Sequence, residues 1–248
     1  MSHKKLYPQD EVDLNKEINK LMKKWHDAAN DDSFCSDGFF PYYTHQKHKV
    51  LVVGREARGL AGFDYINEVL PSVQKNILAD RHINRSAFFR RLMYIVYGIQ
   101  HDFPDFWNEL KPADEIAPTF GTAEGVSCAF MNISKSSNER IKSWTSDWES
   151  ISKSTKTAVE NDFIRKEVSI LAPEIIITLN IEGALKYMVD AGSLEIIESI
   201  GGDLDIFTAT VNGKKCHIFN TWHFAAPGKK DLDSFYAPIQ EAYRRHIK

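Results

Sequence analysis

The stretch KVLVVGREARGL, residues 49–60, is the part of the sequence that decides the fold. Its first apolar residues, VLVV, have the length and branching of a buried strand, and Gly54 is expected to end that strand. Open α/β sheets bind ligands just outside the carboxyl ends of their strands, so the polar residues after Gly54 are candidates for a site. Two interpretations of Arg55, Glu56 and Arg58 stay open: a functional loop, and a solvated charge cluster at a strand-to-helix turn.

Segments with helical and strand patterns alternate along the rest of the chain. Helical spacing of apolar residues predicts helices, and short apolar runs bounded by turn formers predict buried strands. The dipeptide Asn212-Gly213, between two alternating runs, predicts a hairpin because it tolerates the positive φ of a tight turn. Helices are predicted at 14–25, 85–99, 159–171, 181–192 and 235–248, and further buried strands at 125–133 and 174–180.

This alternation predicts an α/β fold, a three-layer αβα arrangement with a mainly parallel central sheet. Residues 46–248 are expected to form that domain, and residues 1–45 an N-terminal helical extension packed on its core. The segment 134–158 is rich in Ser, Lys and Thr and is expected to be a long exposed loop or an irregular helix. Trp144 and Trp148 lie four residues apart in it and are expected to anchor it to the body rather than to stack on bases.

The composition limits the classes of function. The chain has 248 residues and a formal net charge of −3, so any contact with DNA must come from a local basic patch. The cysteines, Cys35, Cys128 and Cys216, are odd in number, far apart and without CxxC spacing, which argues against disulfides and against a cysteine-bound metal. No signal peptide, membrane-spanning run or metal-ligand spacing of histidines is visible. We therefore expect a cytoplasmic protein without membrane partner, metal or cofactor, and we expect it to be a monomer.

Two further strand ends carry residues with useful chemistry. The strand predicted at 125–133 contains Asn132 near its end, and the second arm of the hairpin runs into His223. An amide both donates and accepts hydrogen bonds, so it can read the edge of a base. An imidazole can stabilise negative charge on a leaving group, and a carboxylate such as Glu56 can hold and orient a water. Structural interpretations stay open as well: Asn132 as a cap or turn residue, and His223 as a histidine at the edge of the core.

The order of these motifs resembles the uracil-DNA glycosylase superfamily. The pieces are a strand followed by GREAR, a strand with Asn132, the strand PEIIITLN, and a strand followed by the histidine of TWHFAAPGKK. The similarity covers most of the chain from about residue 49 onward, as short motifs in matching order. Ala57 stands where the family usually has proline, and Phe224-Ala225 replaces the Pro-Ser that usually follows the histidine, so the chain resembles a divergent branch. Its three cysteines cannot supply the four ligands of the iron–sulfur cluster found in some branches.

The resemblance implies a DNA N-glycosylase that hydrolyses the N-glycosidic bond of a deaminated or damaged, uracil-type base flipped into a pocket. It implies that Glu56 activates the attacking water, that Asn132 reads the base, and that His223 stabilises the negative charge on the departing base.

Aromatic and basic residues near the strand ends complete the predicted site. Phe63 is the candidate for stacking on the base. The candidate DNA-phosphate contacts are Arg55, Arg58, Lys229 and Lys230. Three helix residues are expected to be simply solvated: Arg85, Arg90 and Arg91.

Two other functions stay open. The first is a catalytically silent module on the same fold that binds a nucleobase, a nucleotide or a nucleic-acid end. The second is a Rossmann-like enzyme for a small molecule, which is disfavoured because GREARG lacks the glycine pattern that lets a backbone approach a pyrophosphate.

Overall fold

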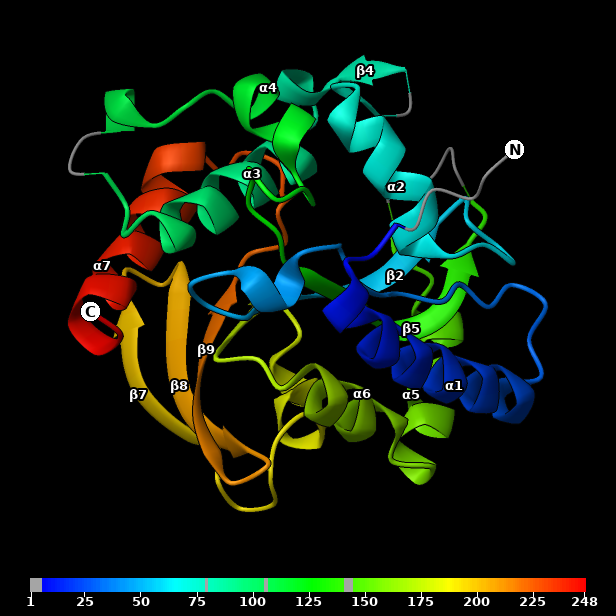
Figure 1. Cartoon of the computed structure of the whole chain (residues 1–248). Coiled ribbons are helices and arrows are strands. Elements are labelled where there is room, and N and C mark those ends of the chain that lie inside the picture. Colours follow the sequence, from blue (N-terminus) through cyan, green and yellow to red (C-terminus); the bar gives the residue numbers. More distant parts are fainter. Residues whose placement is uncertain (1–5, 79, 105–106, 141–144) are drawn as a thin grey trace.

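A seven-stranded mixed sheet with the order β1-β5-β2-β6-β9-β8-β7 forms the centre of the molecule (Figure 1). The computed structural model describes residues 6–78, 80–104, 107–140 and 145–248. The strands are β1 (Gly38–Phe39), β2 (Val50–Arg58), β5 (Ala129–Asn138), β6 (Ile175–Leu179), β7 (Glu195–Ile200), β8 (Leu204–Val211) and β9 (Lys214–Thr221), and a separate hairpin pairs β3 (Ile77–Leu78) with β4 (Arg81–His82).

The central strands β5, β2, β6 and β9 are parallel to one another. At the edges, β1 is antiparallel to β5 and β8 is antiparallel to β9. β7 is antiparallel to β8, so it points the same way as the central strands, and five of the seven strands share one direction. The predicted α/β class with a mainly parallel central sheet is therefore confirmed.

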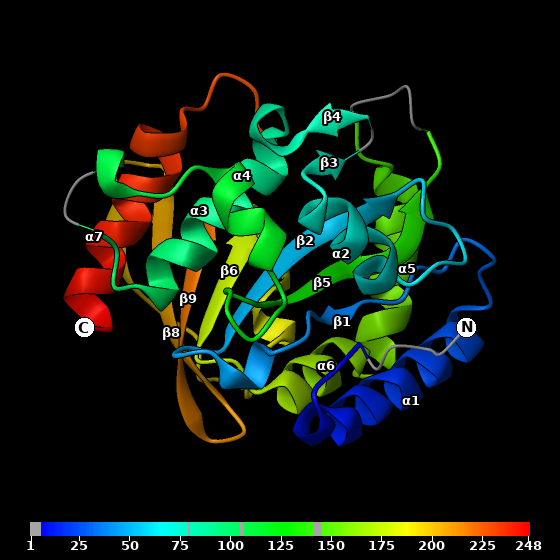
Figure 2. The ribbon, with the colours of Figure 1, turned by 45° about the horizontal axis from the view of Figure 1, so that its top comes forward.

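Helices cover both faces of the sheet (Figures 1 and 2). One face carries α1 (Val12–Ala29), α5 (Trp148–Glu160) and α6 (Phe163–Leu171), and the other carries α2 (Tyr65–Gln74), α3 (Ala87–Gln100), α4 (Ala113–Ile116) and α7 (Ala237–His246). Short 3-10 turns are η1 (Gln9–Glu11), η2 (Tyr43–His45), η3 (Ile83–Arg85), η4 (Trp107–Glu109), η5 (Ala117–Thr119) and η6 (Glu182–Tyr187), and η7 (Leu232–Tyr236) is a π-helical turn. No helix within the described ranges combines membrane-spanning length with an apolar composition.

Each face of the sheet has its own hydrophobic core. Successive side chains of β2 point to opposite faces, so Val50 and Val52 pack in the core under α3, and Leu51 and Val53 pack in the core under α1. Because the strand is buried on both faces, its sequence is a continuous apolar run rather than an alternating one.

The first 45 residues contribute both a helix and a strand. α1 buries the residues that its helical spacing predicts: Ile18, Leu21, Met22 and Trp25. The edge strand β1 pairs with β5. The carboxylate of Glu11 accepts hydrogen bonds from the backbone N–H groups of Tyr42 and Thr44, both at 2.7 Å, and so ties the start of α1 to the chain after β1.

The expectation that Gly54 ends its strand is wrong. β2 continues to Arg58 because β5 is also long and gives it a partner, with Gly54 opposite Asn132 and Glu56 opposite Ser134. The register shifts between Glu56 and Arg58, where the two strands come to their ends.

The segment 134–158 is more ordered than its composition predicts. Residues 134–138 are the buried end of β5, and α5 begins at Trp148 with the Asp147 side chain accepting a hydrogen bond from the Ser150 N–H. The prediction of a long exposed loop is wrong here because buried partners satisfy the polar side chains, for example Asp37 and Glu167 around Lys135. Trp144 lies outside the described residues.

Two predicted helices differ in the structure. The helix predicted at 159–171 is interrupted at Asp162, which has a left-handed φ of 58°, and α6 begins at the next residue. The helix predicted at 181–192 is the short 3-10 turn η6. The predicted hairpin is confirmed, since β8 and β9 are joined by Asn212 and Gly213 with φ values of 54° and 72°.

Candidate functional site

The carboxyl ends of the central strands meet at one edge of the sheet because these strands are parallel. From β2 the chain passes to β5 on one side and then to β6 on the other side, so the strand order reverses between β2 and β6. Such a point is where open α/β sheets bind ligands. Glu56 on β2, Asn132 on β5 and His223, two residues after β9, all come from this edge.

The Asn132 side chain lies across Gly54. A Cβ atom on residue 54 would lie 2.6 Å from the Asn132 Oδ1 and 3.3 Å from the Phe130 Cζ, so only glycine allows this packing. The Asn132 backbone N–H donates to the Asp37 Oδ2 at 2.7 Å, whereas its side-chain amide makes no hydrogen bond to any described residue. The backbone of Asn132 is thus fixed, and its amide is available to a ligand.

His223 is held as a neutral imidazole. Its Nδ1 accepts a hydrogen bond from the Ala225 N–H at 3.1 Å, which assigns the ring proton to Nε2. Burial, together with the positive charges of Arg55, Arg58 and Arg91, lowers the pKa of His223 to about 4. Within the described part of the chain, Nε2 has no hydrogen-bond partner, so it is a neutral donor that can serve a ligand.

Arg91 of α3 positions the loop that follows His223. Its side chain is only 5% exposed, pairs with Asp231 at 2.8 Å, and donates hydrogen bonds to the carbonyl groups of Phe224, at 2.5 Å, and Lys229. Neighbouring Arg90 also pairs with Asp231, at 2.5 Å. The expectation that these two arginines are simply solvated is wrong, because their partners lie about half the chain away in the sequence; Arg85 is exposed as expected.

Phe88 and Phe130 connect Asn132 with His223. The Phe88 ring, at the start of α3, lies 5.6 Å from the His223 ring and 6.0 Å from the Phe130 ring, centroid to centroid. Sequence reasoning missed both, although Phe130 precedes Asn132 by two residues and therefore shares its face of the strand. Phe63, the residue predicted to stack on a base, is 53% exposed in the loop after β2 and has no ring contact within the described ranges.

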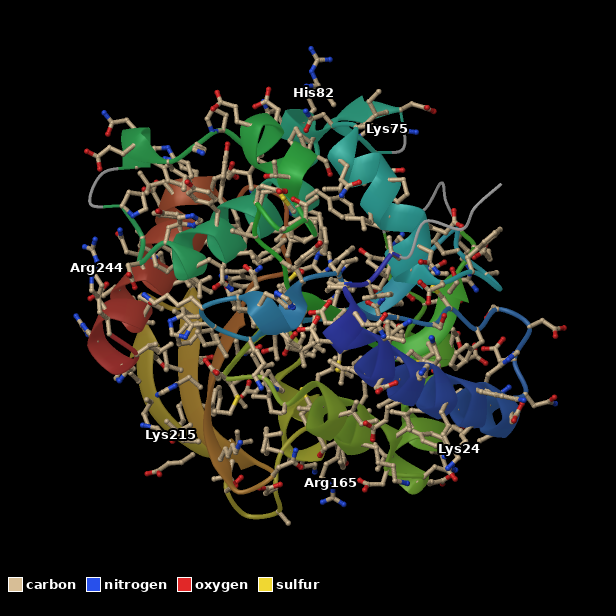
Figure 3. The ribbon with its side chains drawn as sticks, in the orientation of Figure 1. Lys24, Lys75, His82, Arg165, Lys215 and Arg244 are labelled. Atoms are coloured by element: carbon tan, nitrogen blue, oxygen red, sulfur yellow. The ribbon has the colours of Figure 1, made fainter. Side chains whose placement is uncertain are left out.

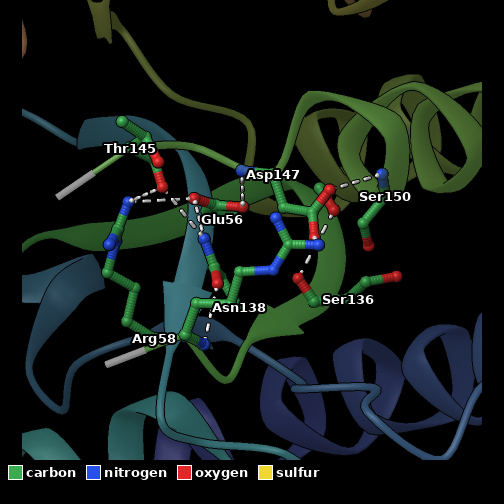
Figure 4. Close-up of polar contacts among 9 residues, drawn as sticks. Glu56, Arg58, Ser136, Asn138, Thr145, Asp147 and Ser150 are labelled. Atoms are coloured by element: carbon green, nitrogen blue, oxygen red, sulfur yellow. Dashed lines mark hydrogen bonds and ion pairs between the residues drawn. The ribbon is translucent and has the colours of Figure 1, made fainter. Parts of the chain in front are cut away.

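Glu56 faces a different set of residues (Figure 4). Its Oε1 accepts hydrogen bonds from Asn138 Nδ2 at 3.0 Å and Arg58 Nη2 at 3.2 Å, and its Oε2 accepts one from the Asp147 N–H at 3.4 Å. The side chain is only 4% exposed. Among the described residues it makes no hydrogen bond to Asn132 or His223, so its contacts join the ends of β2 and β5 to the start of α5.

Three of the four predicted phosphate contacts, all except Arg55, have partners inside the protein. Arg58 pairs with Glu56 and donates to the Thr145 carbonyl at 3.0 Å. Lys229 pairs with Asp203 at 2.7 Å and lies 4.1 Å from the centroid of the Trp222 ring. The exposed Lys230 lies 3.4 Å from Asp233. Other basic side chains come from several elements: Lys75, just after α2, and Lys215 of β9 lie well apart (Figure 3), whereas Lys24 of α1 and Arg165 of α6 line one surface pocket.

A buried ionic cluster lies beneath Asn132. The Lys135 ammonium, with no exposed surface, pairs with Asp37 and, at 2.9 Å, with Glu167. Burial and the charge of Asp37 raise the pKa of Glu167 well above its usual range. Since Asp37 also accepts the Asn132 N–H, this cluster fixes the strand that carries the amide.

The described residues provide neither a metal site nor a reactive thiol at this edge of the sheet. Within the described ranges, no three His, Cys, Asp or Glu side chains are grouped so that they could hold a metal ion. All three cysteines are buried and unbridged, and burial raises the pKa of each thiol.

The comparisons with known proteins found no matching family model, no similar curated protein and no similar solved structure.

Proposed function

We propose that this protein binds a base extruded from a DNA strand and hydrolyses its N-glycosidic bond, as the resemblance to the uracil-DNA glycosylase superfamily implies. The observation that carries the proposal is a pair of polar groups without partners in the described chain, the Asn132 amide and the His223 Nε2–H, at the strand edge where such sheets bind ligands. Phe88 and Phe130 supply aromatic surface between the two.

Each group has a part in this reaction. The Asn132 amide can pair with the donor and acceptor edge of one base and leave another base with an unmatched group. Negative charge builds on the base as the glycosidic bond breaks, and the Nε2–H of His223 is a preorganised donor for an oxygen that carries this charge. A neutral imidazole suits this role because its Nε2–H is already positioned as a hydrogen-bond donor at neutral pH.

The second candidate function is a silent module that binds a base without cleaving it. The contacts of Glu56 favour this alternative, since both of its oxygens already accept hydrogen bonds from the protein. For catalysis, a remaining lone pair of Glu56 must hold the attacking water, or another group must do so.

Alkali treatment separates the two functions. The purified protein is incubated with oligonucleotides that carry uracil, hypoxanthine or another altered base, and the strands are then heated in alkali. A glycosylase leaves an abasic site that breaks in alkali, so we expect cleavage at the altered base. Strands that stay intact with every base, while the protein still binds them, would establish the silent module instead.

A further inference from the structure

An open groove lies on the other side of the same strand edge. It has a volume of about 770 Å³ and lies between α5 and η6, on the face of the sheet that carries α1. The lining residues that matter here are Arg55, Ile133, Trp148, Ile151, Asn180 and Ile181, and we call this the Arg55 groove. Its size is in the range that holds a nucleotide-sized ligand.

Arg55 connects the groove to the candidate site. Arg55 follows Gly54 directly in β2, and successive strand side chains point to opposite faces. Gly54 faces Asn132, whereas Arg55 lines the groove. The Arg55 Nε is buried without a hydrogen-bond partner in the described chain, so the protein leaves this guanidinium incompletely paired. The fork of N–H donors on a guanidinium suits an anionic group.

Trp148 gives the groove an aromatic wall. The sequence predicts that Trp148 anchors its segment, but the side chain is 62% exposed at the first residue of α5. The Arg55 guanidinium carbon lies 5.2 Å from the centroid of its ring. Exposed aromatic rings beside cations are the usual binding elements for unpaired bases, because every base has a π-face.

We propose that the Arg55 groove binds an unpaired nucleotide next to the extruded base, and that the protein therefore prefers single-stranded to double-stranded nucleic acid. The neighbouring base packs on Trp148 and the apolar floor, and Arg55 contacts the phosphate between the two nucleotides. This inference rests on the proposed function, which places the extruded base near Asn132.

The geometry of the edge favours a single strand. A strand that occupies both sites must bend around the carboxyl edge of the sheet, where β6 ends, since the two sites lie on opposite faces. Unpaired nucleotides can make this bend, whereas a duplex is stiff over about 150 base pairs and keeps its base faces stacked. Arg55 and Lys156 are balanced by Glu160 and Glu182 in the lining, so one phosphate contact is the electrostatic contribution that we expect.

The test measures binding separately from base excision. Affinities of a labelled single strand and its duplex, both without altered bases, are measured over a range of salt for the wild type, Trp148→Ala, Trp148→Phe and Arg55→Ala. Ile196→Ala and Arg165→Ala are matched controls, because Ile196 is 55% exposed on β7 and Arg165 pairs with Asp162 outside the groove. Thermal unfolding of each variant shows that it is folded.

We expect the wild type to bind the single strand more tightly, and Trp148→Ala to lose about tenfold in that affinity with little change for the duplex. Trp148→Phe keeps most of the affinity, because it keeps a ring. Arg55→Ala lowers the salt slope for the single strand by about 0.7, the value of one phosphate contact. Both controls bind like the wild type.

Equal affinities for single strand and duplex, or unchanged binding by Trp148→Ala, would overturn this inference. A free nucleoside monophosphate that binds as tightly as the oligonucleotide would also overturn it, because the groove would then be a small-molecule site. The outcome is distinguishable from failure of the proposed function. If binding depends on Trp148 but no base is excised, the proposed catalysis is wrong and the groove proposal stands. If bases are excised but Trp148 has no effect, the groove proposal is wrong and the proposed function stands.

Discussion

Gly54 and Glu56 lie two residues apart on β2, yet their surroundings differ in one decisive respect. The Asn132 amide, which lies against Gly54, and the His223 Nε2–H at the same edge of the sheet have no hydrogen-bond partner in the described chain. The Glu56 carboxylate, by contrast, accepts hydrogen bonds from the Asn138 side chain and from the Asp147 N–H. Folding usually satisfies buried polar groups internally, so groups left without partners at a strand edge are the ones suited to a ligand. The contrast separates residues whose polar groups hold the strand ends together from residues whose polar groups are available to a ligand.

His223→Ala should have the largest effect, since it removes the donor on the Gly54 side. Excision should fall by roughly 10²–10³-fold, the scale for losing one preorganised donor, while DNA affinity should hardly change. Single-turnover excision and equilibrium binding measure the two quantities. His217→Ala is the matched control, because His217 lies on β9 and also has a pKa lowered, by burial first, to about 4. Equal rates for His223→Ala and the wild type would assign His223 a structural role.

Gly54→Ala should weaken binding of an extruded base by about tenfold, as expected when an amide pair is lost. The new methyl group would lie 2.6 Å from the Asn132 Oδ1, so the amide must move. Competition between oligonucleotides with different altered bases measures the lost discrimination. Ile196→Ala, at an exposed residue of β7, is the control for a substitution away from the site. Unchanged discrimination in Gly54→Ala would show that Asn132 is not the base reader.

Glu56→Gln tests whether the Glu56 side is purely structural. The glutamine amide places a donor against the Asp147 N–H or against Asn138 and Arg58, so the free energy of unfolding should fall by roughly 1–2 kcal/mol. Excision by the folded variant should stay within a few-fold of wild type if Glu56 only joins β2, β5 and α5. A loss of excision rate as large as that of His223→Ala would instead show that Glu56 holds the attacking water. Denaturant unfolding and single-turnover excision measure the two effects.

The pH dependence of stability tests whether His223 is neutral in the folded protein. The pKa of His223 is lowered from 6.5 to about 4 on folding, so the unfolded chain binds more protons between these values. The stabilisation is therefore fully present above about pH 6.5 and is lost as the pH falls through about 4. Between pH 6.5 and 4.5 the unfolding free energy of the wild type should fall more steeply than that of His223→Ala, by at most about 1.4 kcal/mol per pH unit. Parallel slopes in denaturant titrations would show that the ring titrates normally.

Local patterns predicted the parts of the fold that local forces determine. Helical spacing located α1, and the Asn212-Gly213 turn located the β8–β9 hairpin. The same reasoning placed Asn132 and His223 at one strand edge, because parallel strands end together.

Long-range partners explain the predictions that were wrong. Lys135 looked like part of an exposed loop, but Asp37 and Glu167 bury it in strand β5. Arg91 looked solvated, but Asp231 and two distant carbonyl groups hold it. The side chain of Glu56 was expected beside Asn132, and its actual direction depends on Asn138 and Asp147, which no local pattern reveals.

The contacts of Arg91 also make the site depend on distant parts of the chain. The arginine lies on α3 and its carbonyl partners follow β9, so 133 residues separate Arg91 from Phe224. The Arg91–Phe224 hydrogen bond closes a chain segment of 133 residues, and the Asn132–Asp37 hydrogen bond closes one of 95. Neither half of the site is a local structure, so the site exists only when segments from the beginning, middle and end of the chain have come together.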